Sequence, residues 1–283
     1  MTGRPRVVVV GDVAVDVLVE PAAPAVLGAD VPARIRTSPG GAGANTAAWL
    51  AHLGADVVLV ARVGDDDAGR AAAAHLAAFG VRPALAVDDG CPTCTVVVLL
   101  GGGERTMLSD RGAAARLAPA DLPPLDGADH LHVSGYVLLD ASSRPAGLAA
   151  LAAARAAGLT TSVDPQAAPA LGPEFARWVG GVDLLLPNAD ELAALGGPAA
   201  VRDVVGAVAV TDGPRGARWL DRAGEWVAAA PEAHVVDPTG AGDAFDAGLL
   251  VAWLGGAGRE AALRAGCAAG AAAVAGLGAR PRR

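Results

Sequence analysis

The stretch DPTGAGDAF, residues 237–245, places two glycines directly before an aspartate, at the point where a helix is expected to begin. Residues 243–254 repeat apolar side chains at roughly three- and four-residue spacing, which predicts an amphipathic helix. Free backbone N–H groups and aligned peptide dipoles at a helix N-terminus attract anions. Gly240 and Gly242 lack a Cβ, so an anion can approach their backbone closely. A tight strand-to-helix turn would also explain the glycines, but it gives no reason for Asp243.

Asp243 beside such a turn is suited to phosphoryl transfer. Its carboxylate can accept a proton from an attacking hydroxyl group while the backbone N–H groups stabilise charge on the transferring group. The reaction needs positioning, a metal, anion stabilisation and a base, and it needs no covalent intermediate. All 22 basic residues are arginines, which excludes a P-loop lysine, a lysine nucleophile and a Schiff base.

The composition narrows the class of protein further. The chain of 283 residues suffices for one large α/β domain, and with 53% hydrophobic but only 3% aromatic residues its core should consist of Ala, Val and Leu. A net charge of −8 without a basic stripe argues against a nucleic-acid partner. The longest uncharged apolar stretch, residues 265–279, is too short to span a membrane. We therefore expect a cytoplasmic protein that binds neither nucleic acid nor membrane.

The three cysteines are Cys91, Cys94 and Cys267. A small, odd number in a chain of this length argues against a disulfide framework and indicates a reducing compartment. Cys91 and Cys94 form a CxxC pair, but neither a second pair nor a nearby histidine accompanies them. Small buried residues that lead into a strand explain this pair better than a metal site does.

Strands and helices alternate along most of the chain, which predicts crossover connections and a mainly parallel sheet. Two segments interrupt this alternation. Residues about 12–38 and about 91–108 are strand-rich and lack helical periodicity. We expect them to pair as a small sheet outside the main one, because no linker is long enough to separate two independent domains.

Four motifs, in this order along the chain, resemble those of the ribokinase-like (PfkB) family of carbohydrate and nucleoside kinases. Residues 39–69 resemble the family's N-terminal signature, and DPTGAGDAFDAGLL resembles its C-terminal signature. PNADEL, residues 187–192, resembles the NxxE element, and TDGPRGA, residues 211–217, resembles a nucleotide-loop motif. The resemblance implies a single three-layer α/β/α domain over residues 1–283, with a mainly parallel central sheet and a β-sheet lid formed by the two strand-rich segments.

The resemblance also implies roles for individual residues. Asp243 would be the catalytic base, and the anion hole for the γ-phosphate of ATP would consist of the N–H groups of Gly240, Ala241 and Gly242. The Mg²⁺ ion would be held, through waters, by Asn188 and Glu191. The nucleotide would be bound by Asn188, Thr211, Gly213, Gly216 and Cys267, although a buried small thiol is the plainer interpretation of the last. The acceptor would be bound by Asp12, Asp16, Gly40, Gly41, Asn45, Arg105 and Tyr136.

Two further features come with the family. Some members bind a K⁺ ion, and here Asp237 and Thr239 would form that site. The lid covers the substrate in such kinases and often mediates dimers, so a homodimer through the lid is expected.

The acceptor is expected to be a small sugar phosphorylated on a hydroxymethyl group. Asp12 and Asp16 lie on one face of the predicted strand, and two carboxylates there invite a polyhydroxylated ligand. Residues 164–168 read DPQAA and lack the arginine of the sugar-acid kinases, and Ala14 stands where ribose-specific members carry an asparagine, so neither acceptor is favoured. The alternatives are a nucleoside kinase of the same fold, which the scarcity of aromatic residues disfavours, and a catalytically silent metabolite-binding protein, which the intact Asp243 disfavours.

Overall fold

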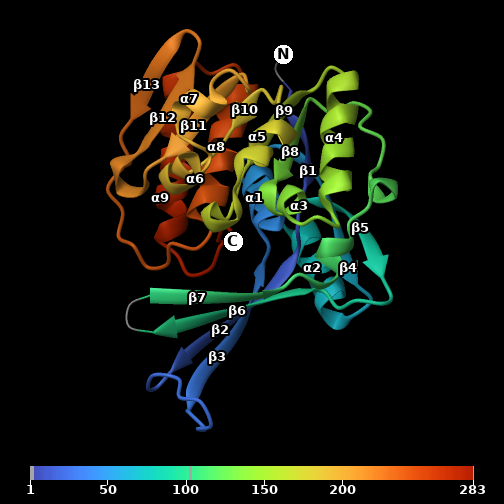
Figure 1. Ribbon diagram of the computed structural model, residues 1–283, viewed down its shortest axis with the longest axis vertical. Helices are drawn as coiled ribbons and strands as arrows, with labels where there is room; N and C mark the ends of the chain where they lie inside the picture. The colour runs from blue at the N-terminus through green and yellow to red at the C-terminus, as the bar shows by residue number, and fades with distance from the viewer. Residues whose placement is uncertain (1–2, 102–103, 283) are drawn as a thin grey trace.

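The computed structural model describes residues 3–101 and 104–282, which form two β-sheets at different ends of the molecule (Figure 1). The larger sheet contains, in spatial order, β13 (Gly224–Ala228), β12 (Ala217–Asp221), β11 (Ala207–Thr211), β10 (Leu184–Leu185), β9 (Thr160–Asp164), β8 (His130–Ser134), β1 (Arg6–Val10), β4 (Asp56–Gly64) and β5 (Arg82–Asp88). The strands from β11 to β5 run parallel, whereas β12 and β13 form an antiparallel hairpin at one edge. The predicted mainly parallel sheet is therefore confirmed.

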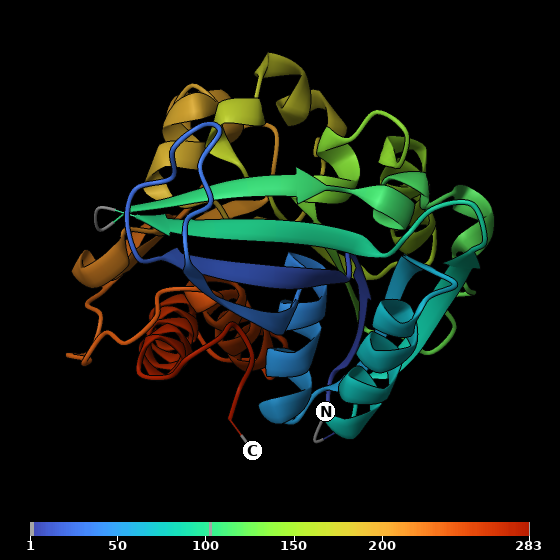
Figure 2. The ribbon, with the colours of Figure 1, turned by 90° about the horizontal axis from the view of Figure 1, so that it is seen from below.

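Two layers of helices cover the sheet, and Figure 2 shows them on its opposite sides. One layer contains α1 (Ala42–His52), α2 (Asp67–Ala78), α8 (Ala241–Leu254) and α9 (Arg259–Val274). The other contains α3 (Gly135–Leu139), α4 (Arg144–Ala156), α5 (Pro173–Trp178), α6 (Ala189–Ala194) and α7 (Pro198–Val201). Short 3₁₀ turns span Gly112–Arg116, Pro119–Asp121, Ala168–Ala170 and Gly213–Arg215.

The central strand β1 shows why the sheet lies between two apolar cores. Its four consecutive valines are all buried. Val7 and Val9 pack into the core beneath α1, α8 and α9, whereas Val8 and Val10 pack into the core beneath α4. Side chains alternate between the faces of a strand, so an uninterrupted apolar run fits a parallel strand that is covered on both sides.

Two buried histidines of β8 share one serine hydroxyl of β9 as a hydrogen-bond partner. The rings of His130 and His132 each lie 2.8 Å from the Ser162 hydroxyl, and both side chains are buried. Burial lowers the pKa of His130 to about 3 and that of His132 to about 4, and the neighbouring His132 adds to the shift of His130. The two neutral rings therefore hold together the strands whose carboxyl ends carry Ser134 and Asp164.

The second sheet consists of β3 (Ala33–Gly40), β2 (Ala14–Pro21), β6 (Cys94–Gly101) and β7 (Glu104–Asp110), in that order. β2 pairs antiparallel with β3 and parallel with β6, and β6 and β7 form the predicted hairpin, whose residues 102–103 lie outside the described residues. Figure 1 shows this sheet extending below the α/β body. It is formed by the two strand-rich segments identified in the sequence, and we call it the lid sheet.

Cys94 is buried and Cys91 is partly buried, and both are free thiols. The Cys91 sulfur accepts a hydrogen bond from Arg116 at 3.3 Å. Burial raises the pKa of Cys94 to about 12, which agrees with a packing role. Among the residues that the structure describes, no helix has both the length and the apolar character needed to cross a bilayer.

Candidate active site

The predicted site residues gather at the carboxyl ends of the parallel strands. Asp12 follows β1, Asp164 ends β9, Asn188 follows β10 and Thr211 ends β11. The N-terminus of α8 lies at the same edge. There the side chain of Asn45 of α1 donates a hydrogen bond to Asp243 of α8. Crevices at this edge are where open α/β sheets bind their ligands.

The two glycines of the anion-binding turn serve different purposes. Gly240 has a φ of +76°, and a Cβ on it would lie 2.5 Å from the Ala279 carbonyl oxygen, so glycine is required for packing. Gly242 has no atom within 4 Å of the place where a Cβ would project. With Ala241 it lines a cavity, and the first-turn N–H groups of a helix have no partner inside that helix. The backbone of α8 is therefore open to an anion at Gly242.

The cavity at this turn has a volume of about 760 Å³ and a mostly apolar wall that suits a nucleobase. Its lining includes four of the predicted nucleotide-binding residues, Thr211, Gly213, Gly216 and Cys267. Cys267 is buried on α9, and its sulfur lies 4.0 Å from the Ala228 carbonyl oxygen. Burial raises the pKa of this thiol, so Cys267 is a packing element of the cavity wall.

Asp243 lies in the first turn of α8 and is 9% exposed. Asn45 donates to its Oδ2 from Nδ2 at 3.0 Å. Burial raises the pKa of Asp243 to about 7; the charges of Asp12 and Asp16 add to this shift, and the hydrogen bond from Asn45 opposes it. A carboxylate with a pKa near the working pH is well matched to general base catalysis.

The predicted acceptor residues Asp12 and Asp16 are brought close to Asp243. Asp12 lies in the turn between β1 and β2, and its carboxylate accepts hydrogen bonds from Arg111 at 3.1 Å and from the Gly43 N–H at 3.2 Å. Asp16 lies on β2, and burial raises its pKa to about 6, the charge of Asp12 adding to the shift. A Cβ on Gly40 would lie 2.2 Å from Asp16 Oδ1. Gly40 therefore gives the carboxylate its space.

Gly41 makes a similar close approach. Its φ is +91°, and a Cβ there would lie 2.6 Å from the Asp12 carbonyl oxygen. Gly40 and Gly41 thus allow the Asp16 side chain and the Asp12 backbone to pack closely against them.

Arg111 is a site residue that sequence reasoning did not select. Its guanidinium lies 5.0 Å from the centre of the Tyr136 ring and pairs with Asp12. One terminal nitrogen, Nη2, is buried with no hydrogen-bond partner among the described residues. Tyr136 is the second residue of the short helix α3 and is partly buried, and burial raises its pKa to about 12. The only sequence signal was an arginine directly after the strand β7.

Arg105, in contrast, was predicted to contact the acceptor. Its backbone belongs to β7, opposite Leu100 of β6, but its side chain lies outside the described residues. Its role stays a prediction.

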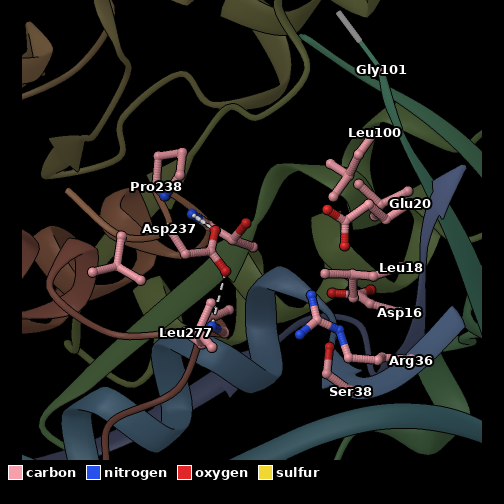
Figure 3. A pocket seen from close by; sticks show the side chains of 15 residues that line it. Asp16, Leu18, Glu20, Arg36, Ser38, Leu100, Gly101, Asp237, Pro238 and Leu277 are labelled. Carbon is pink, nitrogen blue, oxygen red and sulfur yellow. Dashed lines mark hydrogen bonds between the residues drawn. The ribbon is translucent and has the colours of Figure 1, made fainter. Parts of the chain in front are cut away.

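A second cavity of about 760 Å³ lies between the lid sheet and the loops around α8 (Figure 3). Asp16, Leu18 and Glu20 of β2 face it from one side, and Asp237, Pro238 and Leu277 face it from the other. Pro238 also lines the cavity at Gly242, which we call the nucleotide cavity after the predicted nucleotide-binding residues in its wall. The segment between Asp237 and α8 therefore separates the two cavities.

The predicted K⁺ site consists of Asp237 and Thr239. The Asp237 carboxylate accepts from the Thr239 N–H at 2.9 Å with one oxygen and from the Gly278 N–H at 2.9 Å with the other (Figure 3). These contacts join the turn before α8 to the C-terminal segment. Binding of K⁺ here stays a prediction.

Asn188 and Glu191 form a capping box at the start of α6. Asn188 Oδ1 accepts from the Glu191 N–H at 2.9 Å, and Glu191 Oε2 accepts from the Asn188 N–H at 2.8 Å. The i, i+3 spacing of the two residues thus caps the N-terminus of α6. Burial raises the pKa of Glu191, and the hydrogen bonds with Asn188 oppose the shift.

Two buried carboxyl groups that sequence reasoning did not select accompany Glu191. Burial raises the pKa of Asp164 well above its usual range, and the charges of Glu191 and Asp243 add to the shift. Burial also raises the pKa of Asp246, with Asp164 as the strongest neighbouring charge. Asp246 Oδ2 is buried and has no hydrogen-bond partner among the described residues. Asp246 follows Asp243 by three residues on α8, so its spacing was a signal that the sequence contained.

Comparisons with known proteins agree on one family. A family model described as pfkB family carbohydrate kinase matches residues 4–282. The chain is 34% identical over 260 residues to an ATP-dependent ribose-1-phosphate kinase of Halopiger xanaduensis, covering 87% of this chain and 83% of that protein.

Solved structures show the same fold. An aminoimidazole riboside kinase from Salmonella enterica, complexed with aminoimidazole riboside and an ATP analogue, is 28% identical with a TM-score of 0.80, covering 97% of this chain and 95% of that one. A putative ribokinase II from E. coli in complex with ATP and Mg²⁺ is 24% identical with a TM-score of 0.86, covering 97% and 94% of the two chains.

Proposed function

Since this chain belongs to the pfkB family of carbohydrate kinases and is an ATP-dependent phosphotransferase that acts on a sugar or nucleoside, we propose that it transfers the γ-phosphate to a hydroxymethyl group of a small sugar, with Asp243 as the general base. One observation carries the assignment of the base. Pro238 lines both large cavities, and the α8 N-terminus that follows it presents Gly242 to the nucleotide cavity and Asp243 to Asp12 and Asp16. Donor and acceptor can therefore meet at this turn.

The chemistry follows from the atoms around Asp243. Its Oδ2 is occupied by the Asn45 amide, which leaves Oδ1 to accept the proton of the acceptor hydroxyl. The Gly242 N–H at the open start of α8 stabilises the charge on the transferring phosphoryl group, because a preorganised donor there needs no reorganisation. The Ala241 N–H donates to the Pro238 carbonyl oxygen at 3.3 Å and so fixes the turn that presents Gly242. Asp12 and Asp16 accept hydrogen bonds from the remaining hydroxyls of the sugar and fix its orientation.

The carboxylates near α6 fit a divalent cation. When bound, Mg²⁺ neutralises charge on the β- and γ-phosphates. Within the described ranges, no three His, Cys, Asp or Glu side chains are arranged to hold an ion directly. Mg²⁺ keeps several waters in such sites, so Asn188, Glu191, Asp164 and the unpartnered Oδ2 of Asp246 are proposed to hold it through water.

A nucleoside kinase is the second candidate, and the cavity under the lid sheet favours it. Leu18, Leu100 and Leu277 give this cavity an apolar wall beside Asp16. That wall suits a group attached to the sugar. Two of the three relatives named above, the ribose-1-phosphate kinase and the aminoimidazole riboside kinase, act on ribose derivatives according to their names. A free sugar would leave the apolar wall uncovered, whereas a nucleoside would cover it.

A coupled ADP-release assay tests the function. Pentoses, hexoses, sugar phosphates, sugar acids and nucleosides would be supplied one at a time with ATP and Mg²⁺, each with and without K⁺. We expect turnover with at least one free sugar, and a rise on adding K⁺ would support the Asp237 site. Turnover with nucleosides alone would favour the second candidate, and ATP turnover that depends on no acceptor would contradict both.

We also propose that the lid sheet covers the acceptor and that its outer face pairs with a second copy of the chain. The strand register places Val17, Val19, Ile35, Val97, Leu99 and Leu108 on the face opposite the cavity. Ile35 is 63% exposed and Leu108 is 58% exposed. An exposed apolar sheet face of this kind is typical of an interaction site.

The free thiols and the use of ATP support a cytoplasmic location.

The substitution Leu108→Glu is expected to convert such a dimer to a monomer, because it places a charge in an apolar interface. Met107→Glu is the matched control. Met107 is 51% exposed on the same strand, but its partner Val98 faces the cavity. Light scattering after size-exclusion chromatography measures the mass, and a wild-type protein that is monomeric at all concentrations tested would contradict the proposed pairing.

A further inference from the structure

We propose that Arg280 is a positioning residue that holds the catalytic base in place through the side chain of Asn45. The proposal rests on the proposed function of Asp243 as the base. Arg280 lies in the segment that follows α9, and neither its place in the sequence nor the motifs of the chain indicated a role in the site.

The guanidinium of Arg280 contacts three parts of the chain. Nε donates to Asn45 Oδ1 at 3.3 Å, Nη2 donates to the Gly40 carbonyl oxygen at 3.1 Å, and Nη1 lies 2.7 Å from His75 Nδ1. The residue is 9% exposed. A buried arginine needs such partners, because an unpaired buried charge is costly.

The contact with Asn45 decides which way its amide faces. Arginine only donates hydrogen bonds, so the Asn45 atom beside Arg280 must be the oxygen. The nitrogen then faces Asp243, where it donates to Oδ2. If the amide were turned over, two donors would meet at Arg280 and two acceptors would meet at Asp243. Arg280 therefore selects the orientation in which Asn45 supports the ionised base.

The segment that carries Arg280 is itself held by the two residues that precede it. The Gly278 N–H donates to Asp237, and the Ala279 carbonyl oxygen accepts from Trp49 Nε1 at 2.9 Å. The Ala279 backbone also packs where a Cβ on Gly240 would lie. The end of the chain thus connects the turn before α8 to α1, and Arg280 completes this connection inside the site.

The positive charge of Arg280 also favours the ionised form of Asp243. Several ionisable groups on different elements lie near Asp243: Asp12, Asp16, Asp164, Asp246, Tyr136 and Arg280. Of these, only Arg280 favours ionisation of the base, since the other groups are acids. Burial lowers the pKa of Arg280 to about 10, so it is positively charged at neutral pH.

The test compares Arg280→Gln with Arg282→Gln, a control close by on the same segment. Within the described part of the chain, the Arg282 side chain donates one hydrogen bond, to the exposed Ala275 carbonyl oxygen at 3.3 Å. We expect Arg280→Gln to lower kcat by roughly 10- to 100-fold, a share of the total for general base catalysis. KM for ATP should stay within about twofold, because the nucleotide cavity does not include Arg280. The acid limb of the pH–rate profile should move to higher pH, and Arg282→Gln should leave all three quantities unchanged.

A double-mutant cycle with Asn45→Ala shows whether Arg280 acts through Asn45. We expect Arg280→Gln to have a much smaller effect on kcat in the Asn45→Ala background than in the wild type. Equal effects in both backgrounds, or an Arg280→Gln enzyme with wild-type kcat and pH profile, would overturn the inference.

Two further variants keep the outcomes distinct. Arg280→Lys retains the charge, so the acid limb of its pH–rate profile should lie near that of the wild type, and part of kcat should return. If a nucleotide-binding measurement shows that Arg280→Gln is unfolded, Arg280→Lys is used in its place. Failure of Arg280→Lys to differ from Arg280→Gln in pH profile would also count against the inference. If Asp243→Asn keeps its activity, the proposed function itself fails, whereas an inactive Asp243→Asn with a normal Arg280→Gln removes only the role of Arg280.

Discussion

Asp243→Asn is expected to lower kcat by about 10²- to 10⁴-fold, the range for loss of a general base. The amide has nearly the shape of the carboxylate but cannot take the proton of the acceptor hydroxyl. Binding of ATP and of the acceptor should change little, because Gly242 and the cavity wall are unaltered. Steady-state ADP release with each substrate varied in turn measures kcat and both KM values.

Two further observations separate loss of the base from loss of the fold. Burial raises the pKa of Asp243 to about 7, so the stability that it contributes is present at low pH and is lost as the pH rises through about 7. Asp243→Asn removes this buried charge and should therefore be at least as resistant to heat as the wild type above pH 7. The exposed Asp203→Asn should match the wild type in rate and melting temperature.

The pH dependence provides the same test in the wild type. The base works only when ionised, so kcat/KM should rise with pH and level off above about pH 7. Activity of Asp243→Asn within tenfold of the wild type would show that another group accepts the proton.

Gly242→Val is expected to reduce kcat/KM for ATP by about 10²- to 10³-fold. Valine keeps the backbone N–H, but its side chain stops the phosphate from reaching that donor, so the loss should be about as large as when one donor of an anion hole is removed. The new side chain would project into space where no protein atom lies within 4 Å of the Cβ position, and it would fill the place of the phosphate. The free energy of unfolding should change by less than about 1 kcal/mol, because valine is no worse than glycine in a helix. Isothermal titration with an ATP analogue measures the binding loss directly.

Gly240→Ala provides the contrast, because the neighbouring glycine has the opposite surroundings. Its φ of +76° and the Ala279 oxygen 2.5 Å from the Cβ position mean that even a methyl group strains the backbone. We expect a loss of stability of about 1–3 kcal/mol. Full ATP affinity in Gly242→Val would place the phosphate elsewhere, and the assignment of the α8 N-terminus as the anion hole would then be wrong.

Much of the architecture could be predicted from the sequence because the signals are local. The four valines of β1 are buried on both faces, and α8 begins at Ala241, beside the predicted start. The lid sheet follows from two segments without helical periodicity. Each of these features depends on residues within one turn or one strand, where periodicity and glycine placement are informative.

The partners of the site residues were decided by the tertiary structure. Asn45 and Asp243 are 198 residues apart, and Arg280 and Asn45 are 235 residues apart. The sequence by itself indicated the proposed base and the proposed anion-binding turn, since both lie in one short stretch. It did not identify Arg280 or Arg111, because an arginine enters a buried site only where the strand order brings an opposite charge or an acceptor beside it. It did not identify Asp164 either, because only the folded sheet brings that carboxyl group close to Glu191 and Asp243. That order depends on contacts between distant segments, which local spacing does not record.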